Sequence, residues 1–204
     1  MAMTQRQLAA QETRKKLLDA GRTLINAKGL ANTSVEEITE AAGVSKGTFY
    51  TYFKRKEDIV FELSKGMFGE ILENARAFEG DFLQKLTYYM VNFSGHIEDS
   101  SVKLAQEWVS NVAGPCPAKQ MYDRGKLPYD LASVTELLKH GVSQGLLPEE
   151  LSVEALAHTL VDVLYGQMLC WAMSDGAYGL KERTREFCEL YLEDLVNVSG
   201  GIIR

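Results

Sequence analysis

Helical spacing of apolar residues runs through nearly the whole chain of 204 residues and constrains the fold more than any other feature. Apolar residues recur three and four positions apart, as in amphipathic helices. No run of β-branched residues alternates as a strand would, and Gly and Pro fall between the helical stretches. The sequence therefore predicts an all-α fold. We expect about nine helices, at approximately residues 7–27, 34–42, 45–53, 56–78, 81–98, 101–113, 129–144, 152–174 and 180–198.

One segment, residues 114–128, lacks this spacing. It begins with Gly114-Pro115-Cys116-Pro117, which ends the helix before it, and it contains Gly125 and Pro128. Proline and glycine together interrupt a helical pattern. We expect a loop or a short helical turn there.

Charge is divided unevenly along the chain. Residues 1–56 contain ten Lys and Arg against five Asp and Glu, a net charge of +5, whereas residues 57–204 contain twelve against twenty-three, a net charge of −11. The whole-chain net charge of −6 hides this division. A basic first part on an acidic remainder indicates a polyanion-binding domain joined to a domain with a different role.

Several classes of protein are excluded by composition. No stretch approaches the roughly 18 consecutive apolar residues of a membrane span, so we expect no membrane partner. Residues 1–11 are polar and lack the apolar segment of a signal peptide, so we expect a cytoplasmic protein. The cysteines are too few and too far apart for a disulfide framework or a CxxC metal site, and reduced thiols are expected, with a redox sensor as the alternative. These cysteines are Cys116, Cys170 and Cys188.

The stretch from Ser34 to Lys56 has the pattern of a helix-turn-helix, two short helices joined by the turn Ala42-Gly43-Val44. In the second helix Phe49 and Phe53 are four positions apart, so both face inward against the first helix. The remaining side chains of that helix then face outward. They are Lys46, Thr48, Tyr50 and Thr51.

These outward side chains combine a cation, hydroxyl groups and an aromatic ring, which suit phosphate oxygens, base edges and thymine methyl groups. The basic triplet Lys54 to Lys56 follows at once and can contact the DNA backbone. Structural alternatives exist for each residue. Tyr50 and Tyr52 could be packing residues, and the triplet could be a solvated face.

The helix-turn-helix lies within a longer run, about residues 11–71, that resembles the tetracycline-repressor (TetR) family of bacterial transcription regulators. One mild departure is Ser34, where the family favours threonine, although serine keeps the hydroxyl group. The resemblance is carried by Ala20-Gly21, Gly29-Leu30, Thr33 to Ile38, Ala42 to Phe53 and Lys54 to Asp58.

The resemblance implies a three-helix helix-turn-helix DNA-binding domain at residues 1–56 and a larger helical effector-binding and dimerisation domain at residues 57–204. It implies a ligand-responsive repressor that binds a palindromic double-stranded DNA operator as a homodimer. It also implies specific DNA contacts. They are Thr33 and Ser34 at phosphate, Ser45, Lys46, Gly47, Thr48, Tyr50, Thr51 and Tyr52 at or near DNA, and Lys56 on the DNA backbone.

The last two expected helices, 152–174 and 180–198, are apolar almost all round, so each must be covered on two sides. We expect these helices to form a four-helix bundle with the same two helices of a second copy. Two copies of the chain would then form a homodimer.

The middle helices are rich in large, adaptable apolar side chains, as are pockets for apolar or aromatic small molecules. We expect such an effector, although plain core is the alternative for each of these residues. The candidate ligand-binding residues are Met90, Phe93, Trp108, Met121, Tyr122, Tyr129 and Met168.

The sequence offers little for catalysis. Its histidines, His96, His140 and His158, are far apart and form neither an HExxH motif nor a paired ligand spacing. We therefore expect no catalytic residue, no metal site and no cofactor, and we expect that the chain is not an enzyme. The alternative to a DNA-binding regulator is a ligand-binding or protein-interaction module without sequence-specific DNA binding, and the intact outward face around Lys46 and Tyr50 argues against it.

Overall fold

The computed structural model describes residues 4–113 and 126–201, and the side chains of all of these except residues 111–113. Within these ranges the chain is all-α, as the sequence predicts, with nine helical segments when Leu180–Ser199 is taken as one. The chain divides into two compact units, Met1–Gly66 and Met67–Arg204. The division falls within a long helix, whereas the boundary expected from sequence, after residue 56, lies at the start of that helix.

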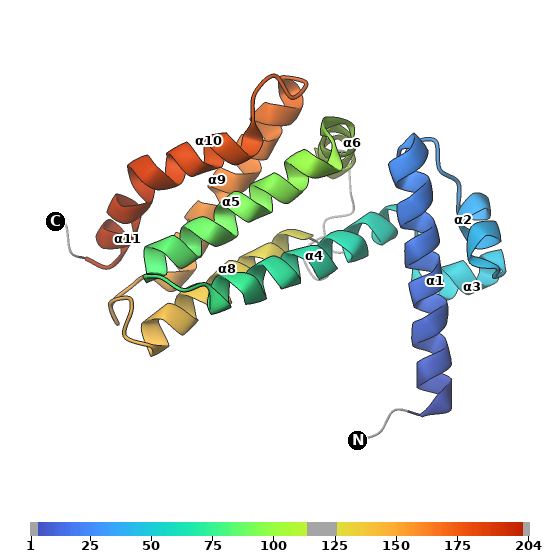
Figure 1. Ribbon diagram of the computed structural model, residues 1–204, viewed down its shortest axis with the longest axis horizontal. Helices are drawn as coiled ribbons and strands as arrows, with labels where there is room; N and C mark the ends of the chain where they lie inside the picture. The colour runs from blue at the N-terminus through green and yellow to red at the C-terminus, as the bar shows by residue number, and fades with distance from the viewer. Residues whose placement is uncertain (1–3, 114–125, 202–204) are drawn as a thin grey trace. The chain divides into compact units, whose positions relative to one another are not determined.

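The N-terminal unit holds three helices and the first part of a fourth (Figure 1). They are α1 (Gln5–Lys28), α2 (Val35–Ala42), α3 (Lys46–Tyr52) and α4 (Glu57–Ala77). All four contribute buried apolar side chains to one small core. The core residues are Leu17, Ile25, Leu30, Ile38, Phe49, Phe53 and Ile59.

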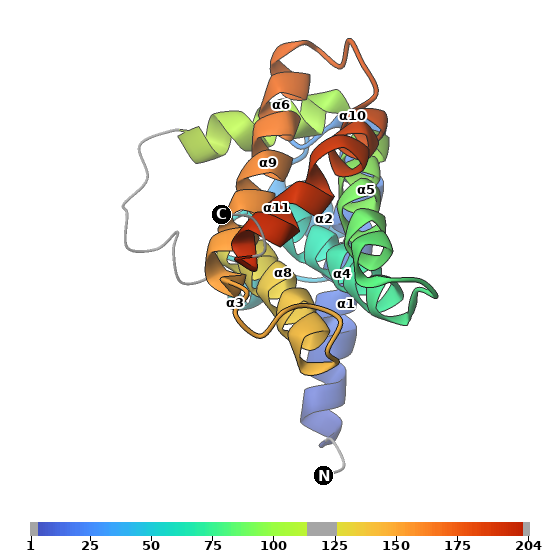
Figure 2. The ribbon, with the colours of Figure 1, turned by 90° about the vertical axis from the view of Figure 1, so that its left-hand side faces the viewer.

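The C-terminal unit holds the rest of α4 and the helices that follow it, and Figure 2 shows them from one end. Helix α10 packs against α5, and both α6 and α8 pack against α9 around a larger apolar core. The segment η1 is a turn of π-helix that joins α10 to α11 without a break. The bounds are α5 (Phe82–Ser100), α6 (Val102–Ala113), α8 (Lys126–Ser143), α9 (Val153–Met173), α10 (Leu180–Phe187), η1 (Cys188–Leu192) and α11 (Glu193–Ser199).

Two details differ from the helices expected from sequence. Helix α8 begins at Lys126 rather than near residue 129, because Pro128 lies in its first turn, where a missing N–H costs no intrahelical hydrogen bond. The last helix contains a π turn that apolar spacing does not reveal. Of the irregular segment expected at 114–128, residues 114–125 lie outside the described residues.

The described helices include none that is both long and apolar enough to cross a membrane. In the same ranges, no group of three or more His, Cys, Asp or Glu side chains is placed to hold a metal ion. Cys170 is exposed and Cys188 is buried, and both are free thiols, whereas Cys116 lies outside the described residues.

Close packing between α1 and α4 explains a glycine in the middle of a helix. A Cβ atom placed on Gly21 would lie 2.7 Å from Ile59 Cγ2, far inside van der Waals contact. Both residues are buried, and Ile59 is fixed by the surrounding core. The glycine is therefore required by helix packing.

Gly21→Ala should destabilise the chain by about 1–3 kcal/mol through overpacking, even though alanine is the better helix former by about 1 kcal/mol. Denaturant unfolding of the full chain measures this change. Gly66→Ala is the matched control, because Gly66 lies in α4 with no described atom within 4 Å of a Cβ placed there. The control should gain stability, and a loss of stability in both variants would contradict the packing explanation.

Candidate nucleic-acid interface

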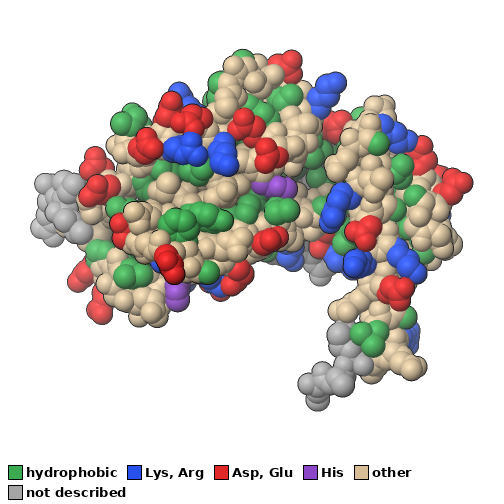
Figure 3. All heavy atoms as spheres, in the orientation of Figure 1, with side chains coloured by type: hydrophobic (Ala, Val, Ile, Leu, Met, Phe, Trp, Pro, Cys, Tyr) green, Lys and Arg blue, Asp and Glu red, His purple; other side chains and the backbone are tan. Residues whose placement is uncertain are grey.

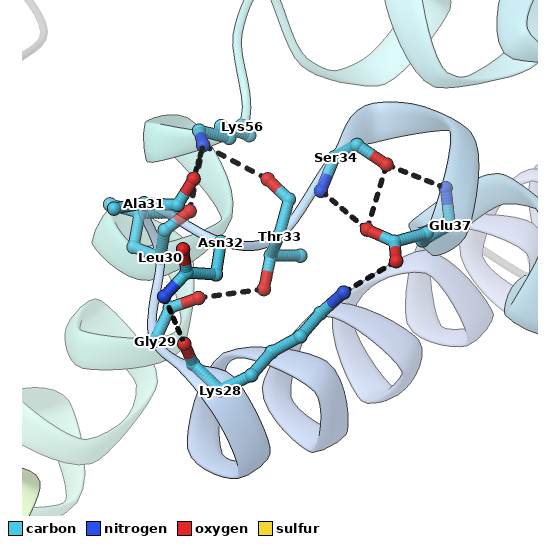
Figure 4. Close-up of polar contacts among 9 residues, drawn as sticks. All are labelled: Lys28, Gly29, Leu30, Ala31, Asn32, Thr33, Ser34, Glu37 and Lys56. Atoms are coloured by element: carbon cyan, nitrogen blue, oxygen red, sulfur yellow. Dashed lines mark hydrogen bonds and ion pairs between the residues drawn. The ribbon is translucent and has the colours of Figure 1, made fainter.

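The loop between α1 and α2 is fixed by hydrogen bonds to its own backbone (Figure 4). Gly29 ends α1 with a φ of 83°, and the Thr33 hydroxyl donates to the Gly29 carbonyl oxygen at 2.8 Å. Asn32 Nδ2 donates to the Lys28 carbonyl oxygen at 3.0 Å. Thr33 is only 1% exposed, so its hydroxyl group is directed into the loop.

Ser34 and Glu37 begin α2 with the capping box that their spacing predicts, and the structure confirms it. Ser34 Oγ accepts from the Glu37 N–H at 3.2 Å, and the Ser34 N–H donates to Glu37 Oε2 at 2.9 Å. The same carboxylate pairs with the Lys28 ammonium group. The hydrogen bonds from Lys28 and Ser34 lower the pKa of Glu37 to about 2. Ser34 therefore secures the start of α2.

Lys56 ties this loop to the start of α4. Its Nζ donates to the carbonyl oxygens of Leu30, Ala31 and Thr33, at 2.7, 3.3 and 2.9 Å (Figure 4). A lysine ammonium group has three N–H donors. These three carbonyl groups therefore use all of them.

Two of the residues for which the family resemblance implies phosphate contacts hold the loop in shape. The Thr33 side chain is buried and its hydroxyl donates to the backbone, so a phosphate contact would require this hydrogen bond to be replaced. The Lys56 ammonium group donates to three loop carbonyls, which a phosphate would have to displace. Contact of these two residues with phosphate stays a prediction.

The turn between α2 and α3 requires Gly43, whose φ of 66° lies in the left-handed region. The next helix begins at Ser45, whose Oγ accepts from the Thr48 N–H at 3.1 Å. Residues 43–47 also match the G-x-S-x-G pattern of hydrolase nucleophiles, but that pattern needs a strand before the serine. Here Ser45 follows a helix and caps the next one.

The inward face of α3 is as predicted. Phe49 and Phe53 are buried, and their ring centroids lie 5.5 Å apart. The guanidinium group of Arg14 lies 5.6 Å from the Phe53 ring centroid and pairs with Glu62 of α4. The two phenylalanines therefore join α3 to the core of the N-terminal unit.

The opposite face of α3 is open to solvent. Tyr50 is 50% exposed, and its ring meets that of Phe49 edge-on at 5.4 Å. The Thr51 hydroxyl donates to the Gly47 carbonyl oxygen, which leaves its methyl group free to turn outward. Contact of this face with DNA remains a prediction. Its exposed residues are Lys46, Gly47, Tyr50 and Thr51, whereas Thr48 and Tyr52 are partly buried.

Lys46, the first residue of α3, forms an ion pair with Glu36 of α2 that no sequence pattern indicates. Both side chains are exposed. Their hydrogen bond raises the pKa of Lys46 and lowers the pKa of Glu36, because each group stabilises the charged form of the other. The ion pair therefore places a carboxylate beside the ammonium group that is expected to contact a phosphate or a base.

The expected ligand-binding residues of the C-terminal unit differ in burial. Met90, Phe93 and Met168 are buried, and Trp108 and Tyr129 are partly buried and pack against the core. Met121 and Tyr122 lie outside the described residues, so those two expectations are not addressed by the structure.

A capped and packed helix-turn-helix with an open polar face defines the class of this protein as DNA-binding regulators. Residues 17–63 match the model of the bacterial regulatory proteins of the tetR family. The chain is 30% identical over 196 residues to the HTH-type transcriptional regulator AcrR of Shigella flexneri, with 90% of this chain and 89% of AcrR covered. The chain therefore belongs to the tetR family of bacterial transcriptional regulators.

Solved structures have the same fold. FadR of Bacillus subtilis in complex with stearoyl-CoA is 26% identical, with a TM-score of 0.63 over 92% of this chain and 98% of FadR. FadR of Thermus thermophilus in complex with lauroyl-CoA is 24% identical, with a TM-score of 0.72 over 94% of this chain and 96% of that protein. The all-α fold expected from sequence is confirmed.

Lys56→Met should lower the stability of the chain by about 1.5–3 kcal/mol, since hydrogen bonds from a charged donor to three loop carbonyls are lost. Thermal unfolding measures the effect. Lys54→Met is the matched control, because Lys54 is exposed and its loss should leave stability unchanged. If Lys56→Met left stability unchanged and only weakened DNA binding, Lys56 would be a phosphate contact after all.

Glu36→Gln should tighten DNA binding about 2–5-fold at low salt, because the charge of Lys46 is no longer neutralised by a carboxylate and one negative charge near the proposed DNA-binding face is removed. Fluorescence anisotropy with labelled duplex measures the affinity. Glu12→Gln removes an equal charge from an exposed ion pair on α1 and serves as control. An equal gain in DNA-binding affinity in both variants would show that the change in net charge alone causes the effect, and would contradict a specific role of the ion pair.

Proposed function

We propose that the chain is a ligand-responsive repressor that binds a near-palindromic double-stranded DNA operator as a homodimer. Residues 1–56 form the DNA-binding domain in this proposal, and residues 57–204 form the effector-binding and dimerisation domain. Helix α3 enters the major groove, as the second helix of a helix-turn-helix does. The observation that carries the proposal is the exposed face of α3 on a helix-turn-helix whose other face is buried.

Charge supports this assignment. Residues 1–56 have a net charge of +5, and the rest of the chain has a net charge of −11. Figure 3 shows one face, on which acidic side chains are spread over the C-terminal unit among fewer basic ones, and basic and acidic side chains both lie on the N-terminal unit. A duplex attracts the basic domain and repels the acidic one, so the charge favours contact through residues 1–56.

Exposed apolar side chains support the homodimer. Met173 at the end of α9 is 78% exposed, and Leu190 in η1 is 66% exposed. Exposed apolar groups that form a contiguous patch mark interaction surfaces, and the proposed dimer would bring these groups together. Six of the nine exposed positions of α9 alternate four and three residues apart, which is the spacing of a helix-pairing seam. These six are Ala155, Thr159, Asp162, Gly166, Leu169 and Met173, and the other three are Glu154, His158 and Cys170.

Pairing through the last two helices of two copies would form a four-helix bundle with two-fold symmetry. The two α3 helices would then read half-sites about 34–36 Å apart, or a multiple of that distance. An inverted repeat in the operator is the direct consequence.

An effector site in the C-terminal unit is supported by its large, partly aromatic core and by the stearoyl-CoA complex of the similar FadR protein. Release of DNA requires that the effector bind more tightly to a conformer that cannot span both half-sites. Affinity that is equal for both conformers would change nothing.

Selection of binding sites from random duplex DNA with the purified chain should recover an inverted repeat. The selected duplex should then bind with a log–log salt slope of about −5 to −9, as expected for roughly six to ten phosphate contacts. The double variant Lys46→Ala, Tyr50→Ala should lose most of the preference for this sequence. Lys139→Ala, which removes a charge from α8, should retain it.

Two results would contradict the proposal. Unchanged sequence preference in the double variant would show that α3 is not the reading helix. The second result is that no sequence is enriched at low salt, even with protein that was unfolded and refolded to remove bound ligand. This result would contradict a role as an operator-binding repressor.

A further inference from the structure

The C-terminal unit buries a charged pair in its core. Lys126 Nζ lies 2.5 Å from Asp130 Oδ2, and the two side chains are 12% and 1% exposed. The Tyr165 hydroxyl of α9 donates to the same carboxylate oxygen at 2.7 Å. Burial of such a pair costs solvation of both charges, so stability alone is a poor reason for its presence.

Aromatic rings surround the ammonium group of this pair. Lys126 Nζ lies 3.7 Å from the ring centroid of Phe68, 4.6 Å from that of Phe93 and 5.8 Å from that of Tyr165. The Phe68 and Phe93 rings stack with their centroids 4.4 Å apart. Ring faces within about 6 Å attract a cation, and a cage of them is a recognised site for organic ammonium groups.

Two buried polar atoms beside this cage lack partners. Asp130 Oδ1 and the Tyr89 hydroxyl make no hydrogen bond within the part of the chain that the structure describes. Both residues are almost completely buried. Buried polar groups without partners are rare and costly, so each one calls for an explanation. A ligand with N–H donors would supply hydrogen bonds to both.

The charges decide which ligand fits. The Asp130 carboxylate and the ring faces both favour a cation. An anion would be repelled by the carboxylate and by the negatively polarised faces of the rings. Burial also lowers the pKa of Lys126 and raises the pKa of Asp130, so the core favours neither charge of the existing pair. The ammonium group now in the cage belongs to the protein itself.

We propose that this cage binds a protonated amine carried on an apolar or aromatic body, and that Lys126 is an internal substitute which the amine displaces from Asp130. The inference rests on the proposed effector-binding role of the C-terminal unit. Lys126 is the first residue of α8 and keeps some exposure, so its long side chain can turn outward. Phe68 and Phe93 are buried and remain in place to receive the ligand.

The test uses three probes with one ring system: 1-naphthylmethylammonium, 1-naphthylmethanol and 1-naphthoate. Each is titrated into the full chain by calorimetry near neutral pH. The ammonium compound should bind about tenfold more tightly than the alcohol, and the carboxylate should bind most weakly. Tighter binding of the carboxylate, or equal binding of all three, would overturn the proposal.

Substitution of the lysine and substitution of the aspartate should change the affinity for the ammonium probe in opposite directions. Lys126→Met should tighten binding of the ammonium probe about tenfold, because the competing cation is gone, and Asp130→Asn should remove most of the preference for charge. Helix content and thermal unfolding show whether each variant is folded. A folded Lys126→Met variant that binds the ammonium probe no more tightly would overturn the displacement.

Phe68→Leu keeps the core apolar and remains informative if the charge variants fail to fold. It should lower the affinity for the ammonium probe about threefold or more and leave the affinity for the alcohol unchanged. An unchanged ratio of the two affinities would overturn the role of the cage. Operator binding by the same proteins is measured separately. If the ligand proposal fails while operator binding is intact, the proposed repressor function is not contradicted.

Discussion

Helices α2 and α3 contain eight and seven residues, too short to be stable on their own in water. Their stability must come from end caps and from the core that they share with α1 and α4. Ser34 and Ser45 supply the caps, and Ile38 and Phe49 supply buried surface. The exposed face of α3 therefore depends on contacts made entirely behind it. Changes in that core would alter the position of the exposed α3 side chains without direct contact with them.

Local chemistry made the N-terminal unit predictable, since the serine caps, the glycine turn and the spacing of Phe49 and Phe53 are visible in the sequence. The roles of long basic side chains were not predictable. Lys56 and Lys46 reach partners 23 to 26 and 10 positions away, and only tertiary geometry selects those partners. The resemblance placed Thr33 at phosphate, but whether a loop hydroxyl faces inward or outward depends on backbone angles that residue type does not fix.

In the C-terminal unit the described ligand-binding candidates are buried in the core or pack against it, their role in ligand binding stays a prediction, and the charged pair beside them was missed. Lys126 and Asp130 have the i, i+4 spacing of a helical ion pair, which was a usable indication. It was overlooked because the expected helix began near residue 129, after the lysine. Burial of the pair could not be foreseen, because charged residues are rarely buried and an i, i+4 pair is usually on the surface. Its partner Tyr165 comes from a separate helix, which spacing along one helix cannot reveal.

In the proposed homodimer, the π turn at η1 would affect which subunits can associate. An α-helix advances by about 100° per residue, so one additional residue within the turn rotates everything after it by about that angle relative to α10. Val198, which is exposed and follows the turn, consequently has an orientation that a regular helix of the same composition would not give, and the exposed Leu190 lies within the turn itself. A paralogue without the additional residue would offer a seam that does not match this one. Where a cell makes several such regulators, the π turn would favour pairing of like with like and keep their regulatory circuits separate.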